Sequence, residues 1–262
     1  MQAFNYQTPG SVADAAKAAA AADAKLLAGG QSLLASMKLG LAAPETLIDL
    51  GQIAELKGIK VDKDKVTIGA MTTHATVAAS ADVKKAIPAL AALAGEVGDR
   101  QVRNRGTLGG SLANNDPAAD YPAAVLGLGA TVHTNQRTID GDSFFKGLYE
   151  TALADGEIIT AVSFPIPEKA AYQKFKQPAS RFALVGVFVS KGKQGVRVAV
   201  TGAGPVVFRV KALEDKLAAS WTAAACDSVK LPADGLNTDL HGSADYRAAL
   251  IPVLAGRAVA AA

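Results

Sequence analysis

The chain has 262 residues, half of them hydrophobic and 19% charged, with a net charge of +3 at neutral pH; this length suits one large domain or two modest ones. No apolar run approaches the ~18 residues that cross a bilayer, no secretory signal opens the chain, and no basic stretch interleaved with aromatics indicates a nucleic-acid partner. The single cysteine, Cys226, can form neither an intrachain disulfide nor the ligand set of an iron–sulfur cluster, so we expect a cytoplasmic protein without a membrane span.

The first fifty residues are typical of short strands alternating with helices. Ser11 precedes an alanine-rich stretch and offers the side chain of a helix N-cap. Gly29-Gly30 ends an apolar run, and Ser32 is placed to cap the helix that follows. The elements expected here are a strand at 4–6, a helix at 13–22, a strand at 25–28, a helix from 32 to about 39 and a strand at 46–50.

The middle of the chain begins with a hairpin and continues mainly with helices. An Asp/Lys turn separates 58–61 from 66–70, and the Val, Thr and Ile residues on both sides favour strands. Residues 72–98 predict two helical pieces separated near Ile87-Pro88, because proline disfavours a helical residue before it. The elements expected next are a glycine-rich turn at 106–111, an apolar helix at 118–128 and a strand at 130–134.

After Pro165-Ile166-Pro167 the pattern changes to strands followed by helices. Such grouping is typical of a separate small α+β domain, which we place after residue 167. The elements expected in it are strands at 171–176, 184–190 and 196–202, and helices at 210–217, 221–229 and 244–261.

Two glycine motifs about eighty residues apart carry the chemical signal. The first is Leu-Ala-Gly-Gly-Gln-Ser-Leu at 27–33, and the second is Arg-Asn-Arg-Gly-Thr-Leu-Gly-Gly-Ser-Leu at 103–112. Adjacent glycines let the backbone turn tightly and bring bare N–H groups against an anion, and a helix behind them favours a phosphate. An isolated Gly-Gly is usually only a turn, but two facing each other can hold a pyrophosphate. Asp120 is then placed to accept hydrogen bonds from sugar-alcohol hydroxyls.

These two motifs resemble the FAD-binding medium subunit of the molybdenum hydroxylase family, which includes xanthine dehydrogenase and carbon monoxide dehydrogenase. The similarity extends to Glu-Ile-Ile at 157–159, Tyr-Gln-Lys-Phe-Lys at 172–176 and Val-Ala-Val-Thr-Gly-Ala-Gly-Pro at 198–205. The resemblance implies an α+β protein. Residues 1–167 would form a two-subdomain FAD-binding domain of the vanillyl-alcohol-oxidase-like (PCMH) type, split near 55. Residues 168–262 would form a C-terminal domain of the carbon monoxide dehydrogenase flavoprotein type, with a three-stranded sheet plus helices.

The resemblance also implies which residues bind the cofactor, and it implies no catalytic residue and no metal ligand. The expected FAD-binding residues are Ala28, Gly29, Gly30, Gln31, Ser32 and Leu33 in the first loop, Thr107, Leu108, Gly109, Gly110, Ser111 and Asn114 in the second, and Val97, Asp120, Ile159 and Lys176 elsewhere. Lys176 best matches a lysine near the isoalloxazine ring, with Lys174 a close competitor. Phe182 falls where some relatives have a tyrosine beside the ring, and a phenylalanine cannot donate a hydrogen bond there.

The function implied by the family is electron transfer through FAD. Substrate would be oxidised at the molybdenum cofactor of a large subunit, electrons would cross [2Fe-2S] clusters of a small subunit, and the FAD here would pass them to an external acceptor. We expect a heterotrimer, assembled as a dimer of heterotrimers. Two alternatives stay open: a stand-alone FAD-dependent oxidase, and a flavin-free scaffold subunit.

Other motifs carry little functional signal. The Gly-x-Gly after the strand at 196–202 lacks the third glycine of a dinucleotide fingerprint, since Val207 stands there. His74, His133 and His241 lie far apart, and His74 is expected to cap or pack. Arg100, Arg103 and Arg105 flank the second motif, and a phosphate role and a solvated or interface role are both open. Hydrolase and nucleotidase motifs are missing.

Overall fold

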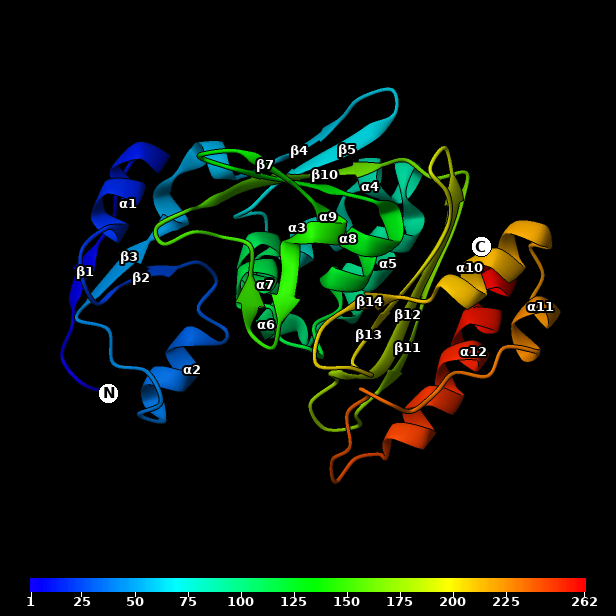
Figure 1. Cartoon of the computed structure of the whole chain (residues 1–262). Coiled ribbons are helices and arrows are strands. Elements are labelled where there is room, and N and C mark those ends of the chain that lie inside the picture. Colours follow the sequence, from blue (N-terminus) through cyan, green and yellow to red (C-terminus); the bar gives the residue numbers. More distant parts are fainter.

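The computed structural model describes all 262 residues and begins with a small parallel sheet. This sheet lies at one end of the molecule (Figure 1), with strand order β1-β3-β2. Its elements are β1 (Asn5–Gln7), α1 (Val12–Ala19), β2 (Ala24–Leu27), α2 (Leu33–Lys38) and β3 (Thr46–Asp49). All five match the expected elements. Ser11 caps α1 by accepting from the Asp14 amide, whereas Ser32 precedes α2 without a side-chain cap bond.

Two short 3-10 helices lead into a second, antiparallel sheet of order β4-β5-β10-β6-β7. The elements are η1 (Leu50–Gln52), η2 (Ala54–Leu56), β4 (Ile59–Val61), β5 (Lys65–Gly69), β6 (Thr131–Thr134), β7 (Thr138–Asp140) and β10 (Ile159–Pro165). The predicted hairpin is confirmed, with Val61 opposite Val66. β10 lies between β5 and β6, so a strand far along the sequence completes this sheet.

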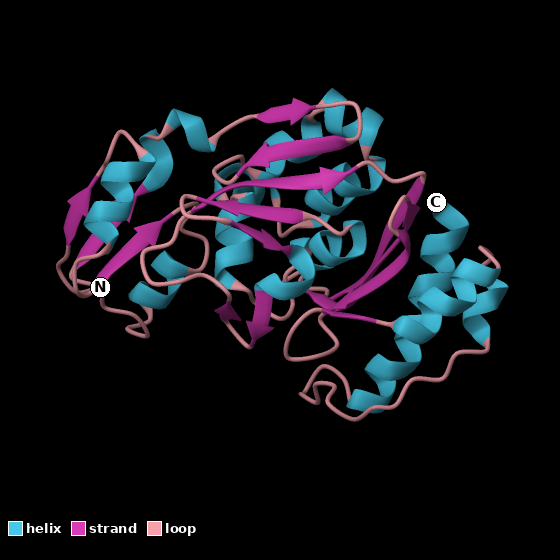
Figure 2. Cartoon of the chain, turned by 45° about the horizontal axis from the view of Figure 1, so that its top comes forward, coloured by secondary structure: helices cyan, strands magenta, loops and turns pink.

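Seven helices and a small hairpin complete this part of the chain, and the helices gather on one face of the second sheet (Figure 1 and Figure 2). They are α3 (His74–Ala79), α4 (Ala81–Ala86), α5 (Pro88–Glu96), α6 (Arg100–Arg105), α7 (Leu108–Asn114), α8 (Tyr121–Leu128), α9 (Gly141–Phe144), β8 (Phe145–Gly147) and β9 (Glu150–Thr151).

Three expectations for this region were wrong in detail. Residues 72–98 form three helices, because Ser80 ends α3 and caps α4 by accepting from the Val83 amide. The glycine-rich turn is instead the first turn of α7, which Thr107 caps. The helix expected from Ala118 begins only at Tyr121, since the Asp116 side chain accepts from the Ala118 amide and holds a turn there.

The C-terminal part is an antiparallel sheet covered by helices. Its elements are β11 (Lys169–Lys176), β12 (Ala183–Gly192), β13 (Gly195–Thr201), β14 (Phe208–Arg209), α10 (Lys211–Ala219), α11 (Ala224–Asp227) and α12 (Ala244–Ala261). The expected three strands are present, but the sheet has a fourth, because β14 turns back to pair with β13. α12 has the predicted bounds, whereas α11 is shorter than the expected 221–229.

Both faces of this last sheet are buried (Figure 1). Phe188 of β12 packs into the same core as the second sheet and its helices, and Gly127 of α8 leaves room for its ring, since an added Cβ would lie 2.6 Å from the Phe188 Cδ1. The neighbouring Val187 and Val189 point the other way, into a core shared with α10, α11 and α12. The chain passes from β10 to β11 at 166–168; the division at 167/168 into independently folding domains stays a prediction.

Candidate functional site

The fold brings the two glycine motifs into direct contact. A Cβ added to Gly29 would lie 2.7 Å from the Gly106 Cα, and closer still to the Arg105 carbonyl oxygen. A Cβ added to Gly110 would lie 3.2 Å from the Ala28 Cβ. The two segments are therefore close-packed, backbone against backbone, and only glycine allows this approach at 29.

The first motif presents a row of free backbone N–H groups. Residues 28–33 connect the end of β2 to the start of α2, and none of their amides donates a hydrogen bond within the chain. Gly30, in the middle of this segment, has φ +74°, a left-handed conformation at which the backbone changes direction. Gln31 and Ser32 are exposed and the other four residues are half-buried, so the amides remain open to a ligand. Successive unpaired amides in a turn form an anion-binding nest.

The second motif differs, because the amides of residues 108–111 are already engaged. The bonds are Leu108 N to Thr72 O (3.1 Å), Gly109 N to Ala70 O (2.8 Å), Gly110 N to Thr107 Oγ1 (3.1 Å) and Ser111 N to Thr107 O (3.0 Å). The expected row of open amides is therefore not present at residues 108–111, whereas the Thr107 amide donates no hydrogen bond within the chain. The segment instead supplies a tightly packed wall beside the nest. That this segment binds FAD stays a prediction.

Two polar side chains of α7 remain available to a ligand. Ser111 and Asn114 lie three residues apart and so share a face of the helix. Both are half-buried, and neither side chain bonds to another group of the chain. The following residue, Asn115, is held in place instead: its Nδ2 donates to the carbonyls of Gly147 and Glu150, 2.8 Å from each.

Asp120 lies just before α8 in a buried ion pair with strand β11 of the C-terminal sheet. Only 4% of the residue is exposed; its carboxylate accepts from the Tyr172 hydroxyl at 2.5 Å and lies 2.9 Å from the Lys174 Nζ. Burial raises the pKa of the Asp120 carboxyl, and the Lys174 ammonium and the Tyr172 hydroxyl oppose that rise. Lys174 is thus committed to Asp120, while Lys176, at the end of β11, is exposed and forms no ion pair.

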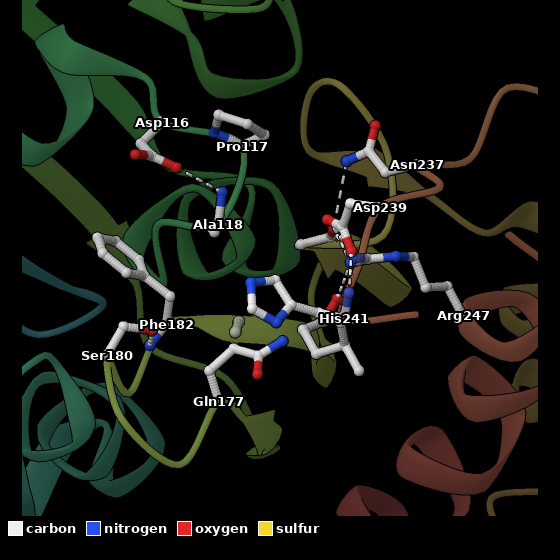
Figure 3. Close-up of a pocket in the computed structure, with 13 residues that line it drawn as sticks. Asp116, Pro117, Ala118, Gln177, Ser180, Phe182, Asn237, Asp239, His241 and Arg247 are labelled. Carbon is white, nitrogen blue, oxygen red and sulfur yellow. Dashed lines mark hydrogen bonds and ion pairs between the residues drawn. The ribbon is translucent and has the colours of Figure 1, made fainter. Parts of the chain in front are cut away.

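A cavity of about 230 Å³ lies at the other end of α7 from the nest. Side chains from separate stretches of the chain converge on it, as Figure 3 shows. The lining residues are Asp116, Pro117 and Ala118 after α7, Gln177, Ser180, Phe182, Ala183 and Leu184 around the start of β12, Gly202 after β13, and Asn237, Asp239, His241 and Arg247 around the start of α12. α7 has seven residues and is therefore about 10 Å long, which sets the separation of nest and cavity.

The remaining expected residues lie around these features. Val97 ends α5, and its carbonyl accepts from the Arg103 guanidinium at 2.9 Å. Arg103 thereby has a structural role, whereas Arg100 and Arg105 are exposed. Ile159 is buried at the start of β10 and packs in the main core.

His74 backs the second motif; of the capping and packing roles expected for it, the structure shows packing, since Thr73 is the N-cap of α3. Its ring is buried, and a Cβ added to Gly106 would lie 2.7 Å from the Nε2. Burial and the nearby Arg103 charge lower the pKa of His74 to about 4. The carbonyls of Ala70 and Thr72 that occupy the second motif were missed, because a backbone acceptor leaves no side-chain signal. The roles of Tyr172 and Lys174 were missed too, because no local pattern links them to Asp120.

The chain has neither a metal-ligand cluster nor a membrane-spanning helix. No three His, Cys, Asp or Glu side chains gather in a group that could hold a metal ion, and Cys226 is buried. None of the helices has both the length and the apolar character needed to cross a membrane.

Comparisons with known proteins identify the class. Residues 2–167 match the family model described as FAD binding domain in molybdopterin dehydrogenase. The chain is 37% identical to the nicotine 6-hydroxylase medium subunit of Paenarthrobacter nicotinovorans, over 99% of this chain and 97% of that protein. It is 36% identical to the carbon monoxide dehydrogenase medium chain of Hydrogenophaga pseudoflava, over 99% and 96%.

Solved structures agree with this similarity over the whole chain. Carbon monoxide dehydrogenase from Hydrogenophaga pseudoflava superposes with a TM-score of 0.88 at 36% identity, covering 100% of this chain and 97% of that one. Quinoline 2-oxidoreductase from Pseudomonas putida 86 gives 0.89 at 31% identity, with the same coverage.

The fold and the free-amide nest thus define a flavoprotein with an FAD-binding domain followed by an α+β region. The chain belongs to the family of FAD-binding medium subunits of the molybdenum hydroxylases, which are multi-subunit oxidoreductases. The resemblance drawn from the two glycine motifs is confirmed.

Proposed function

We propose that this chain takes electrons from [2Fe-2S] clusters of a small subunit and passes them through FAD to an external acceptor. Substrate is oxidised at the molybdenum cofactor of a large subunit, and the complex assembles as a dimer of heterotrimers. Bound FAD supplies the chemistry of this relay, since it accepts electrons singly and delivers them in pairs; the protein fixes its position and its surroundings. The observation that carries the proposal is the row of unpaired amides at residues 28–33.

The nest fits the diphosphate of FAD. Unpaired N–H groups in a turn stabilise negative charge, and the close contact of Gly29 with Gly106 leaves the wall beside them free of side chains. Ser111 and Asn114 are the polar side chains that α7 offers next to this wall. We assign the diphosphate to residues 28–33 and the chain of hydroxyls beyond it to the α7 face.

The cavity at the far end of α7 fits the ring system. It joins apolar surface from Phe182 and Leu184 with polar groups from Gln177 and Asp116, the combination typical of cofactor pockets. Lys176 immediately precedes the loop of residues 177–182, which lines the cavity, and it forms no ion pair. We therefore assign Lys176, rather than Lys174, to the vicinity of the ring. Phe182 can pack against a ring, but it has no hydrogen bond to donate.

The purified full-length chain tests this proposal by its visible absorption. We expect flavin bands and one FAD per chain after heat extraction, and no bleaching of those bands when organic substrates are added to the chain alone. Bleaching by a substrate would instead identify a stand-alone oxidase. A chain that is colourless and cannot be loaded with FAD would identify a scaffold subunit and refute the proposal.

A further inference from the structure

The C-terminal sheet holds one short segment of the cofactor domain, residues 117–120. All of the holding groups come from strand β11 or from the end of β13. The hydrogen bonds are Gly202 N to Pro117 O (2.8 Å), Thr201 Oγ1 to Pro117 O (3.1 Å) and to Ala119 O (2.6 Å), Tyr172 Oη to Asp120 (2.5 Å) and Lys174 Nζ to Asp120 (2.9 Å). We call these groups the 117–120 clamp.

Of the bonds in the clamp, the ion pair should cost the most stability when one of its partners is removed. The Lys174 side chain is fully buried, and its Nζ also donates to the Glu96 carbonyl at the end of α5, at 3.1 Å. Exchanging a buried ion pair for apolar groups changes stability little, whereas removing one partner leaves a buried charge without compensation. The ion pair therefore constrains position: each of the two buried charges is stable only while it stays next to the other.

The clamped segment stands between the two halves of the proposed FAD site. α7, with Ser111 and Asn114, ends three residues before Pro117, and both Pro117 and Ala118 line the cavity. A displacement of residues 117–120 would therefore move the wall of the cavity and the end of α7 together. Asp120 itself is shielded from the cavity, and its carboxylate already has two partners.

We infer that Lys174 is a positioning residue: through Asp120 it holds the 117–120 segment in the place where FAD can bind. This inference rests on the function proposed above. In this role Asp120 acts through the backbone that it fixes.

The charges around Asp120 give the inference a pH signature. The groups that face its carboxylate are Lys174 and Tyr172 from β11, Glu96 from α5 and the adjacent Tyr121. Without Lys174 this cluster keeps two carboxylates and no cation. A buried Asp120 would then stay protonated at low pH, whereas at higher pH it would ionise only by leaving its site for water, which opens the clamp.

The test is FAD binding to full-length Lys174→Met between pH 5.5 and 8.5, followed by flavin fluorescence. We expect wild type to bind with nearly constant affinity. In K174M, binding should weaken with rising pH by up to about tenfold per unit, the linkage limit for one proton. The double variant Asp120→Asn/Lys174→Met removes the charge and should bind without this pH dependence. Hydrogen exchange should show increased opening of residues 117–120 in K174M at high pH only.

Lys211→Met is the matched control, because Lys211 pairs with Asp215 in an exposed ion pair on α10; its FAD affinity should equal that of wild type. If K174M does not fold at any pH, Tyr172→Phe removes one donor to Asp120 and should weaken FAD binding about fivefold. Unchanged FAD affinity at pH 8.5 in K174M, or in Y172F where K174M is unfolded, would overturn the inference. Failure of wild type to bind FAD would instead refute the proposed function.

Discussion

At the scale of single residues, Gly29 determines how closely the two glycine motifs approach. Its α-carbon faces the backbone of Arg105 and Gly106 with no room for a methyl group. The contact is backbone on both sides, so no side-chain rotation can relieve it. Gly29 is therefore required for packing as well as for turning, a role distinct from that of Gly30, whose φ is +74°.

Gly29→Ala should weaken FAD binding at least about tenfold. The added methyl group would force the first motif away from the second, and overpacking of this kind costs roughly 1–3 kcal/mol. The measurement is FAD titration of the apoprotein. Gly10→Ala is the matched control, since an added Cβ there meets nothing within 4 Å. Wild-type affinity in Gly29→Ala would show that the contact can widen without cost.

At the scale of elements, Glu157 fastens the loop before β10 to the hairpin of β6 and β7. Its carboxylate accepts from the Arg137 guanidinium at 3.0 Å, the Thr134 hydroxyl at 2.7 Å and the Ala154 amide at 2.8 Å. The bond from Arg137 is the largest cause that lowers the pKa of Glu157 from 4.5 to about 2. This arrangement fixes the start of β10, where Ile159 enters the core.

Glu157→Gln should lower the free energy of unfolding by roughly 1–2 kcal/mol at pH 7, allowing for the exposed Arg137 side chain. The folded-state pKa is depressed, so the carboxylate stabilises the fold fully above pH 4.5. That contribution disappears as the pH falls through 2. In urea denaturation, the free energies of unfolding of wild type and Glu157→Gln should therefore differ less at pH 3 than at pH 7. Glu168→Gln serves as control, because the Glu168 carboxylate is exposed and bonds to no group of the chain.

The sequence predicted elements well where a local pattern decides them. The bounds of α12 were predicted from its local pattern, and β11 to β13 were recognised from short apolar runs, which in β12 and β13 are buried almost throughout. The second glycine motif was misread as a turn, because nothing local reveals that Ala70 and Thr72 offer carbonyls to it. The same holds for Asp120: the residue was singled out, but its partners lie more than fifty residues away.

At the scale of the whole molecule, the chain contributes an FAD-binding domain to a multi-subunit oxidoreductase. Its cavity lies between the segment that follows α7 and the loops around the start of β12 and the start of α12. This arrangement suits a relay subunit, whose work depends on holding a redox group at a fixed place between partners.

A complex of the large and small subunits without this chain should still show substrate-dependent reduction of the molybdenum centre and the clusters. Reduction of the external acceptor should be lost, and adding back the FAD-loaded chain should restore it. Electron paramagnetic resonance measures reduction of the molybdenum centre and the clusters, and an acceptor assay measures reduction of the external acceptor. If the molybdenum centre stayed oxidised in the absence of this chain, the chain would have to supply chemistry that we assign to the large subunit.

The cores of the molecule are unequal in size, and this has a consequence for exchange of the flavin. One cluster of 30 buried residues joins the second sheet to the C-terminal sheet, whereas the N-terminal sheet is held by clusters of seven and three. We therefore expect the molecule to separate first along the smaller interface, where Gly29 meets Gly106 and the seven-residue cluster joins Ile48 to Met71 and Ile158. Under mildly denaturing conditions we expect the N-terminal sheet to detach first. FAD should then dissociate, while the rest of the chain stays folded and can bind FAD again.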